Sequence, residues 1–101
     1  MHHITHWTVP VNHPAFAGHF PDMPILPGVV LLDVALQAIT DANDMTLAFC
    51  KINSVKFLSP VKPGDVLVIE HKTSVNGTLH FDISTDTRKV ATGSVVLKPS
   101  P

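Results

Sequence analysis

Apolar and polar residues alternate along several short stretches of the chain, a pattern that predicts half-buried β-strands. The clearest case is residues 78–85, where Leu79, Phe81 and Ile83 fall on one face of an extended backbone. The preceding dipeptide, Asn76-Gly77, is typical of a type I′ hairpin turn. In full, the ranges predicted as strands are 4–11, 48–58, 66–75, 78–85 and 90–97.

A different period, close to that of an α-helix, covers residues 28–43. Pro27 is placed where the first turn of a helix accepts proline. Apolar side chains cover most of the circumference, so we expect a helix that is enclosed on most sides. The polar residues of this stretch recur at helical spacing and therefore share one stripe; they are Asp33, Gln37, Thr40, Asp41 and Asp44.

Between the first strand and the helix lies a proline-rich loop, residues 12–27, which holds four prolines. Because proline fixes φ and restrains the residue before it, the loop is expected to be stiff. The element order is then strand, helix and a run of antiparallel strands. This order predicts an α+β fold with one helix packed on a curled antiparallel sheet.

Length and composition restrict the class of protein. The 101 residues fit one domain, 1–101, with 45% hydrophobic and only 15% charged residues and a net charge of −1. These values exclude a disordered tail, a coiled coil and a charge-driven nucleic-acid binder. So few charges on a small domain suggest that a second subunit covers part of its surface.

Cysteine count and targeting signals indicate the compartment. Cys50 is the only cysteine, so no internal disulfide forms, and a single thiol fits a reducing environment. No stretch is long and apolar enough for a membrane span, and the first residues do not resemble a signal peptide. We therefore expect a cytoplasmic protein.

Charge is distributed unevenly along the chain. Residues 1–50 contain four aspartates and no lysine or arginine, whereas residues 51–101 contain seven basic and four acidic residues. The basic half could face an acidic partner. The alternative is a scatter of strand-edge lysines that also block aggregation.

Three residues have side chains or backbone groups suited to one reaction. His19 in the stiff loop is a candidate base, and Asp33, with Leu32 and Val34 beside it, is a candidate acid whose burial would favour the protonated form. Gly28, at the helix start, offers a backbone N–H to a developing oxyanion. Base, acid and donor suit removal of water from a β-hydroxy thioester. From the residues alone, a structural interpretation of each stays open: His19 as a structural histidine, Asp33 as part of a solvated helix face, and Gly28 as part of an ordinary transition from loop to helix.

Residues 13–37, HPAFAGHFPDMPILPGVVLLDVALQ, resemble the signature of the 3-hydroxyacyl-(acyl carrier protein) dehydratases. A second stretch, residues 55–67, VKFLSPVKPGDVL, is also similar to that family. The resemblance implies the hot-dog fold, a curled antiparallel sheet around one long helix. It also implies an acyl carrier protein as partner, a homodimer or an oligomer of dimers with shared active sites, and no cofactor.

The same resemblance implies a role for individual residues. His19 would be the catalytic base and Asp33 the acid, contributed by opposite subunits of a dimer. The N–H of Gly28 would bind the thioester carbonyl. The other residues assigned to the substrate site are Ile25, whose carbonyl would orient His19, Phe20, Gln37 beside the acid, and Val29 along the acyl tunnel.

Some positions depart from the family pattern. Asp22 stands where many members have glycine, and the acid is Asp33 where the broader group has glutamate. The N-terminal segment of longer members has no counterpart in this chain, as in the short dehydratases of aryl-polyene and other specialised lipid pathways. Alternative functions are a hot-dog thioesterase and a non-catalytic acyl-binding or carrier-binding subunit of a heterodimer.

Other residues are given structural interpretations. The histidines near the N-terminus, His2, His3 and His6, are assigned an incidental or structural role and no metal site is predicted. In the strands, His71 and His80 are expected to face solvent. Cys50 and Trp7 are expected to pack against apolar surfaces.

Overall fold

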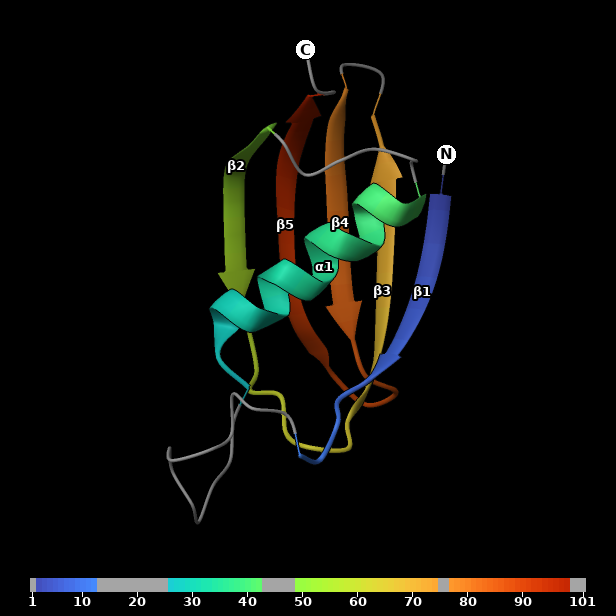
Figure 1. The fold of residues 1–101 in the computed structure, drawn as a ribbon, viewed down its shortest axis with the longest axis vertical. Coiled ribbons are helices and arrows are strands. Elements are labelled where there is room, and N and C mark those ends of the chain that lie inside the picture. The colour runs from blue at the N-terminus through green and yellow to red at the C-terminus, as the bar shows by residue number, and fades with distance from the viewer. Residues whose placement is uncertain (1, 13–25, 43–48, 75–76, 99–101) are drawn as a thin grey trace.

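The computed structural model describes residues 2–12, 26–42, 49–74 and 77–98. One helix lies on a single five-stranded sheet (Figure 1), in which every neighbouring pair of strands is antiparallel. The strand order is β1-β3-β4-β5-β2, which leaves β1 and β2 at the two edges. The elements are β1 His2–Thr8, α1 Gly28–Ala42, β2 Phe49–Phe57, β3 Val66–Thr73, β4 Thr78–Ser84 and β5 Lys89–Lys98.

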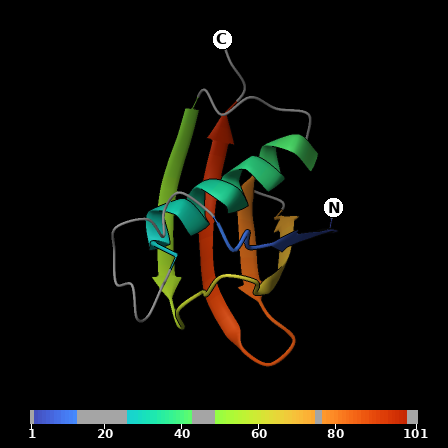
Figure 2. The same ribbon diagram turned by 60° about the horizontal axis from the view of Figure 1, so that its bottom comes forward.

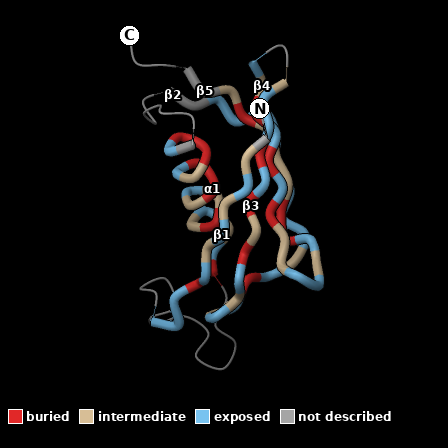
Figure 3. The backbone as a smooth tube through the Cα atoms, turned by 90° about the vertical axis from the view of Figure 1, so that its right-hand side faces the viewer, coloured by how far each residue is buried: buried red, intermediate tan, exposed pale blue. Residues whose placement is uncertain are grey.

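The helix crosses one face of the sheet diagonally, as Figures 1 and 2 show from two directions. Leu31, Ala35 and Ile39, each four residues apart, are buried against the sheet. The strands contribute alternate residues to this core, and Figure 3 shows buried positions recurring along the strands beside α1. On β4 these are Leu79, Phe81 and Ile83, which confirms the predicted alternation.

The helix agrees with its predicted range and is enclosed on most sides, as expected. Val29, Asp33, Gln37 and Asp41, each four residues apart, are exposed along one stripe, and the other residues of α1 whose burial is described are buried or half-buried. Thr40 was misplaced on this polar stripe, because it is only 2% exposed. Its hydroxyl donates to the Gln37 carbonyl at 3.0 Å, which satisfies the buried oxygen within the helix.

The β3–β4 hairpin also differs from the prediction. The Ser74 N–H donates to the Thr78 carbonyl at 2.8 Å, and the Gly77 N–H donates to the Ser74 carbonyl at 3.0 Å. Three residues therefore separate the closing pair, whereas a type I′ turn has two. Gly77 has φ +86°, the left-handed conformation that the last residue of such a loop adopts and that glycine tolerates best.

The paired strands β1 and β3 contribute aromatic side chains that are buried or that pack on buried neighbours. His71 is 1% exposed, so the expectation that it faces solvent is wrong; it shares the face of Leu67 and Ile69. Its ring stacks on His3 of the paired strand, with centroids 5.1 Å apart. Trp7 packs against the core as expected. The side chain of Cys50 lies outside the described part of the chain.

Gly93 of β5 lies where a core side chain and the backbone of β2 both come close to the strand. A β-carbon at this position would lie 2.6 Å from Cζ of Phe81 and 2.7 Å from the backbone oxygen of Ser54. Because Phe81 is fully buried and the oxygen belongs to the main chain, neither can move aside cheaply. We expect Gly93→Ala to lower the free energy of unfolding by at least 1–3 kcal/mol, roughly the cost of overpacking a core.

Urea unfolding of Gly93→Ala and of Gly28→Ala tests this expectation. The three atoms nearest to a β-carbon at position 28 would all belong to the ring of Phe57, the first at 3.0 Å, and that side chain is half exposed, so it can shift at lower cost. Gly28→Ala should therefore cost less than Gly93→Ala. Equal effects of the two substitutions would contradict the assignment of Gly93 to a tight contact.

Candidate functional site

Four of the predicted site residues lie on the helix: Gly28, Val29, Asp33 and Gln37. The other three, His19, Phe20 and Ile25, lie outside the described residues. The helix residues do not converge on one cavity. Gly28 borders one hollow of the surface and Asp33 and Gln37 border another, while Val29, 74% exposed, lines neither.

Gly28 is the first residue of α1 and opens onto a cleft of about 390 Å³. The Pro27 carbonyl accepts from the N–H groups of Val30 and Leu31, so Pro27 caps the helix from the position before the first turn. The Gly28 N–H is thus one of the donors that the helix itself leaves unpaired. The residues that line the cleft are Leu26, Gly28, Leu31, Phe57, Leu58, Ser59, Pro60 and Val61.

Asp33 lies one and a half turns further on, at a groove of about 280 Å³ between α1 and β1. Its side chain is exposed, so the expectation of a buried carboxyl is wrong for a single chain. Asp33 meets apolar surface along the groove floor instead. The lining residues are Thr5, His6, Trp7, Asp33, Val34, Gln37, Ala38, Asp41 and Ile69.

Gln37 lies one turn after Asp33 and lines the same groove. Its amide donates to Oδ1 of Asp41 at 3.2 Å, the carboxylate on the far side from Asp33. In this chain Gln37 therefore makes its contact along the exposed helix face, at the i, i+4 spacing that brings side chains together. Its proposed support of Asp33 stays a prediction.

Helix geometry explains why the two hollows are separate. Gly28 and Asp33 are five residues apart, and at ~100° per residue they point about 140° away from each other around the axis. The predicted donor and the predicted acid thus occupy different sides of α1. Within one copy of the chain, Gly28 and Asp33 line separate hollows.

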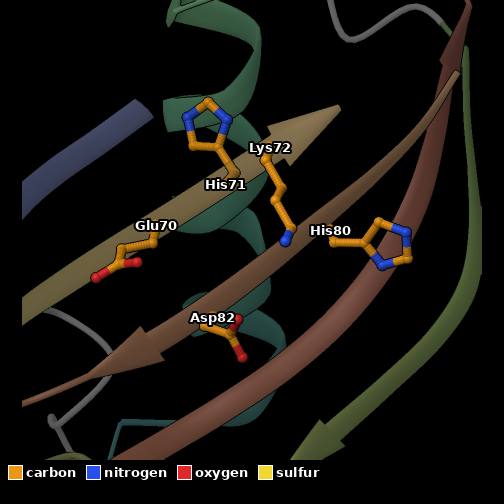
Figure 4. Close-up of a pocket in the computed structure, with 5 residues that line it drawn as sticks. All are labelled: Glu70, His71, Lys72, His80 and Asp82. Carbon is orange, nitrogen blue, oxygen red and sulfur yellow. The ribbon is translucent and has the colours of Figure 1, made fainter. Parts of the chain in front are cut away.

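A third hollow, of about 280 Å³, lies on the opposite face of the sheet (Figure 4). Glu70 and Lys72 of β3 stand directly across from Asp82 and His80 of β4. None of the predicted site residues lines it. Among the described residues, no group of three His, Cys, Asp or Glu side chains is placed to hold a metal ion. Nor does this part of the chain include a helix long and apolar enough to cross a membrane.

An ion pair that the sequence did not indicate lies near the Gly28 cleft. Arg88 donates to Oδ2 of Asp65 at 2.8 Å, and the N–H of Lys62 donates to the same oxygen at 2.9 Å. Partial burial by itself would raise the pKa of Asp65, but the Lys62 N–H, the Arg88 hydrogen bond and both positive charges outweigh it and hold that pKa below its ordinary value.

The lowered pKa of Asp65 predicts a pH-dependent contribution to stability. Because the folded state binds this proton less tightly than the unfolded state, the contribution is present above about pH 4 and disappears as pH falls through the lower folded value. Asp65→Asn should therefore cost about 1 kcal/mol at pH 7, a modest value for a partly exposed pair. That difference from the wild type should shrink as the pH is lowered from about 5 to about 3.

Urea unfolding of both proteins across this range measures the effect. Asp82→Asn is the matched control, because the Asp82–Lys89 pair is 3.7 Å apart and more than half exposed on both sides. An Asp65→Asn deficit that stayed constant down to pH 3 would contradict the role given to the ionised carboxylate.

Comparison with known proteins decides the family. A family model described as ApeI-like, ApeI dehydratase, matches residues 2–94. The chain belongs to the ApeI-like family. Among curated relatives, it is 40% identical over 76 residues to 3-hydroxyacyl-(acyl carrier protein) dehydratase FabZ of Chlamydia muridarum, covering 66% of this chain and 50% of the relative. For FabZ of Aliivibrio fischeri the identity is 44% over 71 residues, covering 61% and 47%.

Solved structures give the same fold for this ApeI-like chain. The dehydratase heterocomplex ApeI:P from Xenorhabdus doucetiae matches with a TM-score of 0.79 and 25% identity, over 95% of this chain and 86% of that one. The dehydratase domain of PpsC from Mycobacterium tuberculosis, at 20% identity, shares the fold with a TM-score of 0.76 over 99% of this chain and 40% of that one. The predicted hot-dog fold is confirmed. The ApeI-like chain spans about half the length of the curated relatives that it matches.

Proposed function

We propose that this chain dehydrates (3R)-3-hydroxyacyl thioesters on acyl carrier protein to trans-2-enoyl thioesters. The observation that carries the proposal is the spacing of His19, Gly28 and Asp33 in a chain of the ApeI-like family. Two features of the described helix support it. Gly28 lines a cleft of about 390 Å³, and Asp33 is exposed at a groove that Trp7, Val34 and Ile69 also line.

In the proposed reaction His19 takes the α-proton of the substrate. The electron pair moves toward the thioester carbonyl oxygen, which the Gly28 N–H stabilises as negative charge develops. Asp33 gives its proton to the β-hydroxyl, the C–O bond breaks and water leaves as the C=C bond forms. Ile25, through its carbonyl, would orient His19. Phe20, Val29 and Gln37 would contact the substrate around these three groups.

The site is proposed to be shared between two chains, most simply in a homodimer. Support comes from the roughly 140° between Gly28 and Asp33 around α1, because a second copy can bring its own Asp33 to the first copy's cleft. Burial of Asp33 against that copy would also supply the apolar surroundings that favour its protonated form. The single cysteine fits a cytoplasmic location for this dimer.

The partner is proposed to be an acyl carrier protein that docks beside the Gly28 cleft. Lys56 and Lys62, both exposed, directly precede and follow residues 57–61, which line that cleft. An acidic carrier would be attracted to this pair as it delivers its acyl chain. Lys62, which follows the cleft residue Val61, supports a docking role beside the cleft. Lys56 lines a separate hollow with His80 on the far face of the sheet, where it adds attraction at longer range.

Lys56→Glu combined with Lys62→Glu should raise the KM for acyl carrier protein substrates about tenfold, because rim charges mainly affect encounter. The KM for a short pantetheine thioester should not change. Lys72→Glu is the control, since Lys72 is exposed on β3 and lines the hollow of Figure 4, which shares no residue with the Gly28 cleft. Steady-state kinetics with both substrates measure the difference. Equal KM values for the carrier protein substrate in the double variant and the control would contradict a docking role for these lysines.

Hydration of a crotonyl-type thioester, the reverse reaction, tests the proposed function. The conjugated absorption of the enoyl thioester should disappear in the presence of the chain, with no release of free thiol detectable by a thiol reagent. Thiol release would support the thioesterase alternative. Binding without turnover, relieved by adding a different subunit, would support the non-catalytic partner of a heterodimer.

A further inference from the structure

Arg88 lies just before β5 and reaches across to the connection between β2 and β3. Its Nη2 donates both to the carbonyl of Pro60 and to Oδ2 of Asp65, each at 2.8 Å. Thr85 fixes the start of the side chain, because its N–H donates to the Arg88 carbonyl and its Oγ1 accepts from the Arg88 N–H. One guanidinium therefore joins the two ends of the β2–β3 connection.

The same connection forms a wall of the Gly28 cleft, through residues 57–61. Its first part is held by backbone, since the N–H groups of Leu58 and Ser59 both donate to the Val90 carbonyl, at 2.8 and 3.3 Å. Pro60 has no N–H to contribute to such a ladder. At Pro60 the wall is held through its carbonyl, by the side chain of Arg88.

Residues 61–65 of the connection form backbone hydrogen bonds with two other segments of the chain. The Leu26 N–H donates to the Val61 carbonyl at 2.8 Å, two residues before the helix begins. Val9 is bonded twice, its N–H to the Asp65 carbonyl and its carbonyl to the Gly64 N–H. Leu26, Val9 and Val61 are all buried. The start of α1 is therefore fixed to the segment that Arg88 braces at both ends.

We propose that Arg88 is a positioning residue for the dehydration: it holds the β2–β3 connection so that the cleft wall and the Gly28 N–H keep a fixed separation. The inference rests on the proposed function for its catalytic part. Arg88 itself is not among the residues that line the cleft, and its guanidinium bonds Pro60 and Asp65. Its effect should therefore fall on turnover, because small displacements of an oxyanion donor cost rate.

Arg88→Met is the direct test, with Lys89→Met as the matched control. Lys89 is the adjacent cation, and the ion pair of its side chain with Asp82 is long, at 3.7 Å, and exposed. In Arg88→Met we expect kcat for crotonyl-thioester hydration to fall roughly 10²-fold with little change in KM. Arg88→Lys should recover part of this loss, since the ammonium keeps the positive charge and its hydrogen-bond donors but sits on a shorter side chain of different shape.

Amide hydrogen exchange separates positioning from general destabilisation. In Arg88→Met the N–H groups of Val9 and Leu26 should exchange faster, while those of Phe81 and Ile83 in the core strand β4 keep their protection. Wild-type kcat in a folded Arg88→Met chain would overturn the proposal, as would equal loss of protection at all four amides. If the wild-type chain showed no turnover, the proposed function would fail, while the exchange comparison would still decide whether Arg88 holds the helix start.

Discussion

Asp33→Ala should lower kcat for the dehydration by about 10²–10⁴-fold, the range that a positioned general acid contributes. The loss should occur without loss of fold, because Asp33 is exposed on the single chain and no hydrogen bond from it to another described residue supports the helix. Kinetics of hydration measure the loss of kcat, and circular dichroism with the unfolding midpoint measures whether the fold is retained.

Two further variants sharpen the test of Asp33. Asp33→Asn keeps the size of the side chain but cannot donate an acidic proton, so it should be as inactive as Asp33→Ala. Asp41→Ala changes an exposed carboxylate that lines the same groove two turns later, and it should keep the wild-type rate. Similar losses in the Asp33 and Asp41 variants would show that the groove needs negative charge and no particular acid.

A mixture of two inactive chains is expected to regain activity. His19→Ala removes the base and Asp33→Ala the acid, and each variant alone should lose about 10²–10⁴-fold in rate. If one site takes His19 from one chain and Asp33 from the other, a mixed dimer contains one intact site and one doubly damaged site. Random exchange of subunits should then restore roughly a quarter of the wild-type rate, because half of the dimers are mixed.

The experiment requires unfolding and refolding the two variants together, with each variant refolded alone as the control. The Asp41→Ala chain refolded with His19→Ala controls for the refolding itself. Since Asp41 is assigned no step, about half of the sites in that mixture should be active whether or not the two chains share a site. Absence of recovery with Asp33→Ala, in a preparation where the Asp41→Ala mixture is active, would place His19 and Asp33 in the same subunit and contradict the shared site.

Periodicity along the chain was enough to predict the elements, because both faces of β4 and the buried side of α1 follow from local spacing. The resemblance of residues 13–37 added the hot-dog fold, which the solved structures confirm. Features that depend on tertiary contact were beyond this reasoning. His71 is buried because its strand position faces α1, and Thr40 is buried because its hydroxyl finds a carbonyl inside the helix.

The candidate site was predictable only in part, for the same reason. A helix spacing places Gly28 and Asp33 on different sides of α1, but it does not tell which sides meet the sheet and which stay open. Asp33 is exposed in the single chain, and the surface that we propose to cover it belongs to a second chain. The brace from Arg88 to Pro60 and Asp65 joins residues 23 or more positions apart, and no local pattern indicates such a contact.

The most direct test of the dehydratase assignment is the intact mass of an acyl carrier protein loaded with a (3R)-3-hydroxyacyl chain. After incubation with the protein, we expect part of the carrier to be lighter by one water, with its acyl chain still thioester-linked and carrying a trans-2 double bond. The Asp33→Ala chain should not bring the carrier to this equilibrium. An unchanged carrier mass, or release of the free carrier thiol, would contradict it.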